Sequence, residues 1–191
     1  PAGIQGALDS RLRGNDGTVV VRETYRARKF EVMASLRAGE APTRAIHGTL
    51  AALSGLADDA LQALWQQSGL PAGVALLAVG GFGRGALFPH SDVDVLLRLP
   101  DGVSPDGDAP LKRRIEAFIG SCWDAGLEIG SSVRTVEECV AQAVGDVTVQ
   151  TSLLEARLIA GSRKLFLAFQ ERFRKTVDAR TFFVAKTLEM R

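Results

Sequence analysis

The hydrophobic positions in the first third of the chain repeat with the period of a helix. Between residues 21 and 37, apolar side chains recur every three or four positions and charged residues occupy the opposite face, which predicts a helix that Gly39 ends. The positions expected to face inward are Tyr25, Phe30, Val32, Met33 and Leu36. Residues 1–20 show no sustained period and are rich in glycine and aspartate, so we expect them to be disordered.

A second helical pattern runs from about Pro42 to Gln67. Proline is common in the first turn of a helix, and here it marks the start. Gly55 and the pair Asp58–Asp59 interrupt the pattern, which predicts two helices with a break between them. The positions expected to face inward are Ile46, Leu50, Leu53, Leu56, Leu61 and Leu64.

After Gly69 the spacing changes from that of a helix to that of short strands. Residues 74–79 form an apolar run that predicts a buried strand, and residues 93–99 predict a second one. The glycine-dense sequence GGFGRG at residues 80–85 predicts a turn after the first strand. Residues 127–134 are a candidate for a third strand.

The remaining segments have helical patterns. Residues 111–126 predict a helix with Gly126 as its C-terminal cap, and Thr135 with Glu138 predicts a capping box at the start of another. Beyond it we expect helix to the end of the chain, with breaks near Gly145, Gly161 and Val177. This order of elements predicts an α+β fold, in which a small mixed sheet has flanking helices and a helical C-terminal region.

Composition narrows the class of protein. The 191 residues are 46% apolar, which is enough for the core of one domain. With 23 Lys and Arg against 22 Asp and Glu, the net charge of +1 gives no reason to expect binding to nucleic acid or to a membrane. No apolar run approaches the roughly 18 residues of a membrane span. Cys122 and Cys139 are too few for a disulfide framework, so we expect reduced thiols in a cytoplasmic protein.

Two carboxylates stand at the start of the second predicted strand. Side chains alternate along a strand, so Asp92 and Asp94 are expected on one face with Cα atoms about 6.6 Å apart. Neighbouring carboxylates repel each other unless a cation lies between them. Their hard oxygen atoms suit Mg²⁺ or Mn²⁺, as metal-assisted phosphoryl or nucleotidyl transfer requires. Taken alone, an Asp-x-Asp sequence is more often a surface or capping feature.

The glycine-dense turn suits a phosphate group. Its glycines lack Cβ atoms, so their N–H groups can approach phosphate oxygens, and Arg84 could donate two hydrogen bonds to one phosphate. These glycines are Gly80, Gly81, Gly83 and Gly85. The pattern is neither a Walker A loop nor Gly-x-Gly-x-x-Gly, because no Lys-Ser/Thr follows and Ala86 stands at the third glycine position. A Gly-Gly pair alone indicates only a turn, but the ten residues that separate it from Asp92, with buried strands on either side, make the joint pattern specific.

These motifs resemble a known superfamily. Gly-Gly, about ten residues and Asp-x-Asp on a strand are the signature of the DNA polymerase β-like nucleotidyltransferases. VGGFGRGALFPHSDVDVLL, residues 79–97, looks like the N-terminal nucleotidyltransferase domain of bacterial protein-PII uridylyltransferases, the bifunctional uridylyltransferase/uridylyl-removing enzymes. Residues 123–139 and 146–161 also resemble that family. The likeness spans about residues 70–191, with a weaker helical match from residue 22.

The resemblance implies an activity, a cofactor and partners. The family transfers UMP from UTP to a tyrosine hydroxyl of the PII signal protein and releases pyrophosphate. By this resemblance Gly80 and Gly81 hold the triphosphate of UTP, and Asp92 and Asp94 bind Mg²⁺, with Mn²⁺ as the alternative. Neither nucleic acid nor a membrane is an expected partner.

Three further residues are candidates for the site. The superfamily usually adds a third carboxylate from a neighbouring strand, for which Glu128 is the candidate, although it could be an ordinary charged residue at a strand entrance. Arg134 could reach a phosphate or form an ordinary salt bridge. Ser91 could cap the turn or touch the phosphate.

Two departures from the family's pattern are visible, and both could alter nucleotide handling. Ala86 stands where the family usually has Glu, and Ser131 where a His usually precedes the sequence SVRT. From the sequence pattern we expect a disordered segment at 1–20 and N-terminal helices at 21–69. The resemblance implies a nucleotidyltransferase catalytic core at 70–145, followed by a helical extension at 146–191. HD and ACT domains are expected beyond Arg191, so this chain should not remove uridylyl groups.

Two other functions stay open. The chain could be another nucleotidyltransferase of the superfamily that uses ATP or modifies a different acceptor. It could also be a non-catalytic module that senses a nucleotide, in which case binding of UTP would be insensitive to Mg²⁺.

Overall fold

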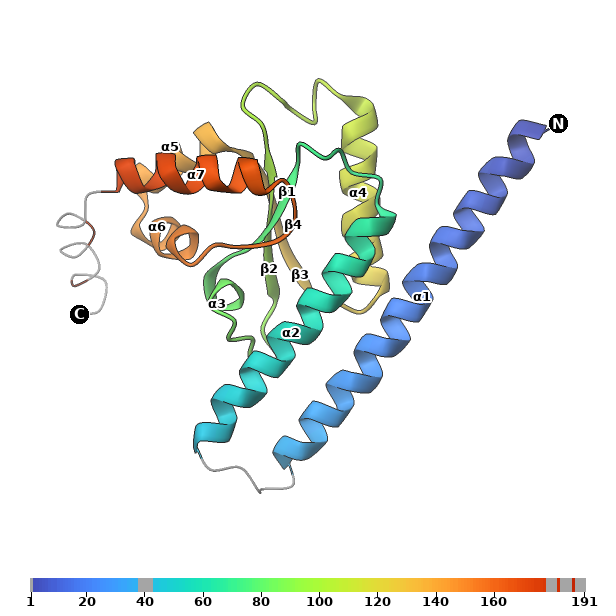
Figure 1. Ribbon diagram of the computed structural model, residues 1–191, viewed down its shortest axis with the longest axis horizontal. Helices are drawn as coiled ribbons and strands as arrows, with labels where there is room; N and C mark the ends of the chain where they lie inside the picture. The colour runs from blue at the N-terminus through green and yellow to red at the C-terminus, as the bar shows by residue number, and fades with distance from the viewer. Residues whose placement is uncertain (1, 38–42, 178–181, 183–186, 188–191) are drawn as a thin grey trace. The chain divides into compact units, whose positions relative to one another are not determined.

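The computed structural model describes residues 2–37, 43–177, 182 and 187, and its α+β architecture is the expected one (Figure 1). The helices and strands are α1 (Ala2–Arg37), α2 (Thr43–Gln67), β1 (Ala75–Ala78), α3 (Gly80–Gly83), β2 (Val93–Leu99), α4 (Ala109–Asp124), β3 (Ile129–Thr135), α5 (Val136–Gly145), α6 (Val147–Leu154), β4 (Arg157–Gly161) and α7 (Arg163–Thr176). Within these ranges, no helix is long and apolar enough to cross a membrane.

The chain divides into two compact units. The first contains Pro1–Leu70, Gly85–Val93 and Ala109–Gly130. The second contains Pro71–Arg84, Asp94–Asp108 and Ser131–Arg191.

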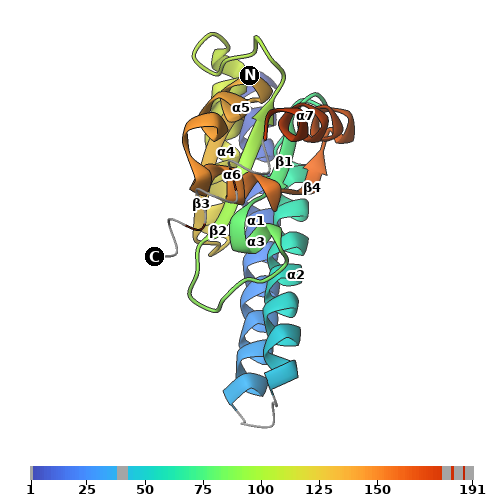
Figure 2. The same cartoon turned by 90° about the vertical axis from the view of Figure 1, so that its left-hand side faces the viewer.

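The first unit contains two long helices that pack against each other. α1 and α2 lie side by side in both views, and α4 packs against both of them (Figures 1 and 2). Trp65 of α2 meets Phe118 of α4 edge to face, with ring centroids 5.6 Å apart. The row of leucines expected to face inward is buried: Leu50, Leu53, Leu56, Leu61 and Leu64.

The long helices differ from the expectation in their extent. α1 begins at Ala2, so the segment expected to be disordered is helical; once a helix has nucleated, each further residue adds a hydrogen bond at little extra cost. α2 continues unbroken through Gly55, since one interior glycine costs only about 1 kcal/mol and the buried leucines on both sides outweigh it. The expected boundaries at Gly39 and Pro42 lie outside the described residues.

Two side chains expected to face inward are exposed. Phe30 is 72% exposed because it lies off the stripe that Val21 and Tyr25 begin at four-residue spacing. Ile46, near the start of α2, is 44% exposed.

Most residues of a four-stranded mixed sheet, in the order β3-β2-β1-β4, belong to the second unit. β1 is buried along its whole length and pairs antiparallel with β2, where Ala75 lies opposite Arg98 and Ala78 opposite Val95. β1 also pairs antiparallel with β4, with a shift in register between Leu76 and Leu77.

The strand β4 corrects the expectation that the chain is helical beyond Thr135. Residues 146–191 are therefore not a purely helical extension, because Arg157–Gly161 completes the sheet. This five-residue run is too short to show a clear period, and it gains its hydrogen bonds from the free edge of β1, which no local pattern reveals.

Helices α5, α6 and α7 bury an apolar core with β1 and β2. The buried members of this core are Ala75, Leu77, Leu96, Val136, Cys139, Ala143, Leu153, Phe169 and Phe173. Arg98 is fully buried beside it, where its Nη1 donates to the carbonyl oxygen of Thr135 at 2.7 Å and its guanidinium lies 4.0 Å from the centre of the Phe169 ring. Burial lowers the pKa of Arg98, although the charge of the nearby Asp101 acts in the opposite direction.

Three local predictions, two about helix caps and one about thiols, are confirmed. Thr135 accepts a hydrogen bond from the Glu138 backbone N–H, and the Glu138 carboxylate accepts one from the Thr135 N–H. Gly126 follows α4 with a φ of 81°. Cys122 and Cys139 are free and buried; burial raises the pKa of both thiols, that of Cys122 to about 12.

Replacing the capping threonine should destabilise the protein. Thr135→Ala removes the side-chain acceptor at the start of α5, so the free energy of unfolding should fall by about 1 kcal/mol in urea titrations followed by circular dichroism. Thr176→Ala is the control, since that hydroxyl donates to the Arg172 carbonyl at the end of α7 and caps no helix N-terminus. Equal effects of the two substitutions would contradict a specific capping role.

Candidate nucleotide site

The glycine-dense sequence after β1 forms one helical turn, α3, in the second unit. Val79, the residue before it, has an extended backbone, and its N–H donates to the carbonyl oxygen of Asp94 at 3.1 Å. At the other end of the turn, the N–H groups of Gly83 and Arg84 bond the carbonyls of Val79 and Gly80 at 3.0 and 3.1 Å. This turn replaces the simple loop turn that the sequence predicted.

The first N–H groups of α3 have no acceptor within the helix itself. They belong to Gly80, Gly81 and Phe82, which is the usual situation in the first turn of a helix. They are donors available to an anion. The sequence hypothesis that this turn binds phosphate needs such donors, although a turn this short is not by itself a binding site.

Gly80 is required by its backbone conformation. Its φ is 58°, in the left-handed region that residues with a side chain rarely adopt. A Cβ atom there would lie 3.7 Å from Asp94 Oδ2 and 3.7 Å from Ser152 Oγ, which is ordinary contact. Glycine is therefore needed at this position for its backbone conformation and not for lack of space. The same distances place the Asp94 carboxylate and the Ser152 hydroxyl beside the turn.

Gly83 is required for a different reason. A Cβ atom there would overlap the backbone carbonyl oxygen of Glu155, which lies against the end of the turn. The next residue, Arg84, is 55% exposed in its side chain and pairs with Glu155 through Nη1 and Oε1 at 2.5 Å. Arg84 was predicted to bind phosphate; in this structure its guanidinium bonds a carboxylate, and binding of phosphate stays a prediction.

The two aspartates lie where the strand alternation predicts. Asp92 directly precedes β2 and Asp94 is its second residue; both are exposed, whereas Val93 and Val95 are buried. Asp92 falls in the first unit and Asp94 in the second. Their donor chemistry, two exposed carboxylates of hard oxygen atoms, fits Mg²⁺ or Mn²⁺. In the described residues no group of three or more His, Cys, Asp or Glu side chains forms a metal site.

A pocket of about 260 Å³ in the second unit lies next to the glycine turn. Its volume is below the roughly 300–1,000 Å³ of most small-molecule pockets, so it suits part of a ligand. Its lining comes from the end of β1, from β2, β3 and α6: Val79, Leu96, Ser132, Arg134, Thr148, Val149, Ser152 and Leu153. Arg134 is half-buried there, and its binding of a phosphate stays a prediction.

Sequence reasoning missed the hydroxyl groups of this pocket. Thr148 and Ser152 are four residues apart and share a face of α6, which Asp146 caps through the N–H groups of Thr148 and Val149. An acidic cap followed by two hydroxyls at this spacing was the available signal. Ser132 of β3 gave no such signal.

The remaining candidates belong to the first unit. Ser91 is exposed, and its N–H donates to the Phe88 carbonyl at 3.2 Å, as a residue in a turn does. Glu128 is exposed, and its backbone carbonyl accepts the Val93 N–H at 2.8 Å. The pKa of Tyr25 is raised mainly by burial and also by the charge of Glu128. The roles of Ser91 and Glu128 at the site stay predictions.

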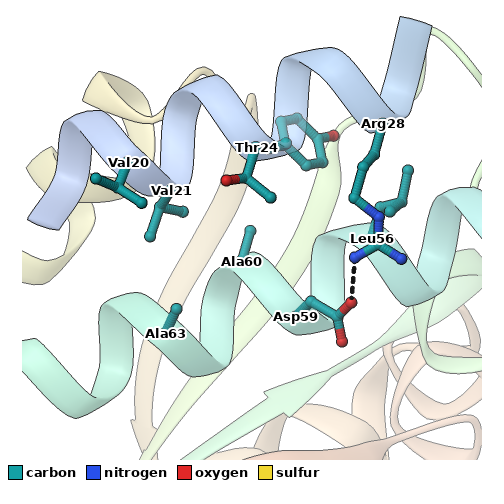
Figure 3. A pocket seen from close by; sticks show the side chains of 9 residues that line it. Val20, Val21, Thr24, Arg28, Leu56, Asp59, Ala60 and Ala63 are labelled. Carbon is teal, nitrogen blue, oxygen red and sulfur yellow. Dashed lines mark hydrogen bonds and ion pairs between the residues drawn. The ribbon is translucent and has the colours of Figure 1, made fainter. Parts of the chain in front are cut away.

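A second pocket, of about 220 Å³, lies between α1 and α2 of the first unit (Figure 3). The alanines at positions 60 and 63 of α2 face Val20, Val21 and Thr24 of α1, so small side chains leave the space unfilled. Arg28 and Asp59 pair at 3.0 Å at its edge. The lining is mostly apolar, which is typical of imperfect helix packing and not of a site for phosphate.

The chain has relatives whose activity is known. Over 167 residues, which are 87% of this chain, it is 56% identical to the "Bifunctional uridylyltransferase/uridylyl-removing enzyme" of Burkholderia mallei (strain SAVP1) and of Burkholderia pseudomallei (strains 668 and K96243). The chain is similar to these enzymes over most of its length. The match covers 18% of each of them, so the chain spans less than a fifth of the curated relatives. No family model matches the chain.

Substituting Gly80 should separate backbone strain from ordinary glycine effects. Gly80→Ala forces a side chain into a left-handed conformation, so stability should fall by about 1 kcal/mol or more. Gly120→Ala, inside α4 with open space around it, is the control and should stabilise by about 0.5–1 kcal/mol. Thermal unfolding measures both, and a neutral Gly80→Ala variant would argue against the conformational requirement.

Proposed function

We propose that this chain is a uridylyltransferase that transfers UMP from UTP to a tyrosine of the PII signal protein and releases pyrophosphate. The observation that carries the proposal is the approach of the Asp94 carboxylate to Gly80, at the start of a turn whose first three N–H groups have no acceptor within the helix. The 56% identity to uridylyltransferase/uridylyl-removing enzymes supports the same activity.

Each part of the site has a role in this proposal. The N–H groups of the turn hold the triphosphate, with Gly80 and Gly81 as the binding residues, and Arg134 lies in the adjoining pocket, where it can donate to the nucleotide. Asp92 and Asp94 hold Mg²⁺, which when bound neutralises charge on the phosphates. Ser91, Arg84 and Glu128 are secondary candidates.

The transfer is a displacement at phosphorus. The tyrosine oxygen attacks the α-phosphorus of UTP, and the bond from this phosphorus to the oxygen that bridges to the β-phosphate breaks. Pyrophosphate leaves with that bonding pair, and the hydroxyl proton passes to a carboxylate, for which Glu128 is the candidate, or to water. The protein contributes orientation and a preorganised field.

Removing the two carboxylate charges should abolish the transfer. Asp92→Asn with Asp94→Asn should lower incorporation of label from α-phosphate-labelled UTP into PII at least about a hundredfold, because the metal loses its ligands. The matched control is Asp106→Asn with Asp108→Asn, an exposed pair at the same spacing in the loop after β2. Full transfer by the well-folded Asp92/Asp94 double variant would refute the proposed metal site.

The same assay separates the alternative functions. A panel of nucleotides should show that UTP alone is productive when PII is present. Transfer from ATP or to another acceptor would indicate a different nucleotidyltransferase. Binding of UTP that is equally tight with and without Mg²⁺, and without transfer, would indicate a nucleotide-sensing module.

A further inference from the structure

The connection between α6 and β4 touches the glycine turn at its C-terminal end. α3 and α6 lie next to each other in the second unit (Figure 1). Glu155 begins this connection; its backbone carbonyl excludes any side chain at Gly83 and its carboxylate pairs with Arg84. A segment more than 70 residues away in sequence therefore fixes one side of the turn.

Arg157, at the end of the same connection, holds the turn through its backbone carbonyls. Its Nε donates to the carbonyl oxygen of Gly83 at 3.4 Å and its Nη2 to that of Phe82 at 3.3 Å. The guanidinium also lies 5.5 Å from the centre of the buried Phe82 ring. Both hydrogen bonds are long and therefore individually weak, but together they restrict the position of the turn.

A cation is the favourable partner at this position. The last carbonyls of a helical turn point away from it and have no partner within it, and they carry partial negative charge. The planar guanidinium of an arginine can donate to two of these carbonyl oxygens at once from N–H groups held in a fixed geometry. A lysine ammonium cannot reproduce that geometry. Because Arg157 bonds the carbonyls, the N–H groups at the opposite end of α3 keep their orientation.

We infer that Arg157 is a positioning residue that keeps the N–H groups of Gly80, Gly81 and Phe82 aimed at the β- and γ-phosphates of the nucleotide. It acts through the backbone of the turn and needs no contact with the nucleotide. The role of the phosphates rests on the proposed function; the bracing of the turn by Arg157 does not.

Hydrogen exchange and nucleotide binding together test the inference. In Arg157→Ala, amide exchange at Gly83 and Arg84, whose N–H groups bond the carbonyls of Val79 and Gly80, should accelerate about tenfold, because two hydrogen bonds that hold the turn are lost. Affinity for UTP with Mg²⁺ should fall about tenfold, and affinity for UMP, which lacks the β- and γ-phosphates, less than about threefold. Arg157→Lys should recover part of both losses.

The control is Arg163→Ala, which removes an exposed arginine at the start of α7 and should leave exchange and affinity unchanged. Equal rates of amide exchange at the turn in the Arg157 and Arg163 variants would overturn the bracing role. Equal losses of affinity for UTP and for UMP in Arg157→Ala would overturn the role toward the phosphates. If Arg157→Ala does not fold, Arg157→Lys is judged by the same two measurements. If the unmodified chain binds no UTP, the proposed function fails, and exchange at the turn still decides whether Arg157 braces it.

Discussion

The register between β1 and β2 is the constraint on which the site depends. Ala78 lies opposite Val95, and the next residue, Val79, donates its N–H to the Asp94 carbonyl oxygen. This pairing brings the end of one strand, where the glycine turn begins, against the acidic start of the other. A slip of one residue would move the Asp94 side chain to the opposite face, away from Gly80. All four residues of β1 are buried, so such a slip would require the side chains on both faces of the strand to pack anew.

The turn is then held from a second direction by a segment that is distant in sequence. Glu155 and Arg157 flank the connection from α6 to β4, and β4 pairs with the edge of β1 that β2 leaves open. The same strand that completes the sheet therefore delivers the arginine that bonds the turn. α6, just before this connection, lines the adjoining pocket with Thr148 and Ser152. Pairing of β4 consequently links the pocket, the turn and the sheet in one structural unit.

The sequence predicted the parts of this arrangement that depend on local chemistry. The apolar runs of β1 and β2, the Thr135 capping box and the alternation of Asp92 and Asp94 with buried valines are all present, because each depends on residues only a few positions apart. β4 was missed because its hydrogen bonds come from a strand about 80 residues earlier in the chain. The partner of Arg84 was missed for the same reason, because Glu155 lies 71 residues away in the sequence. The unbroken α2 shows the converse case, in which buried leucines override a local glycine signal.

The glycines of the turn illustrate how one motif can combine separate physical requirements. Sequence reasoning gave them a single purpose, the close approach of phosphate to the backbone. In the structure, Gly80 is needed for a positive φ and Gly83 for the space that the Glu155 carbonyl occupies. Gly81 lies within α3 and has no positive φ, so the conformational reason does not apply to it. The positive φ of Gly80 and the close backbone contact at Gly83 are therefore requirements of the fold, and at Gly81 the close approach of a phosphate stays a prediction.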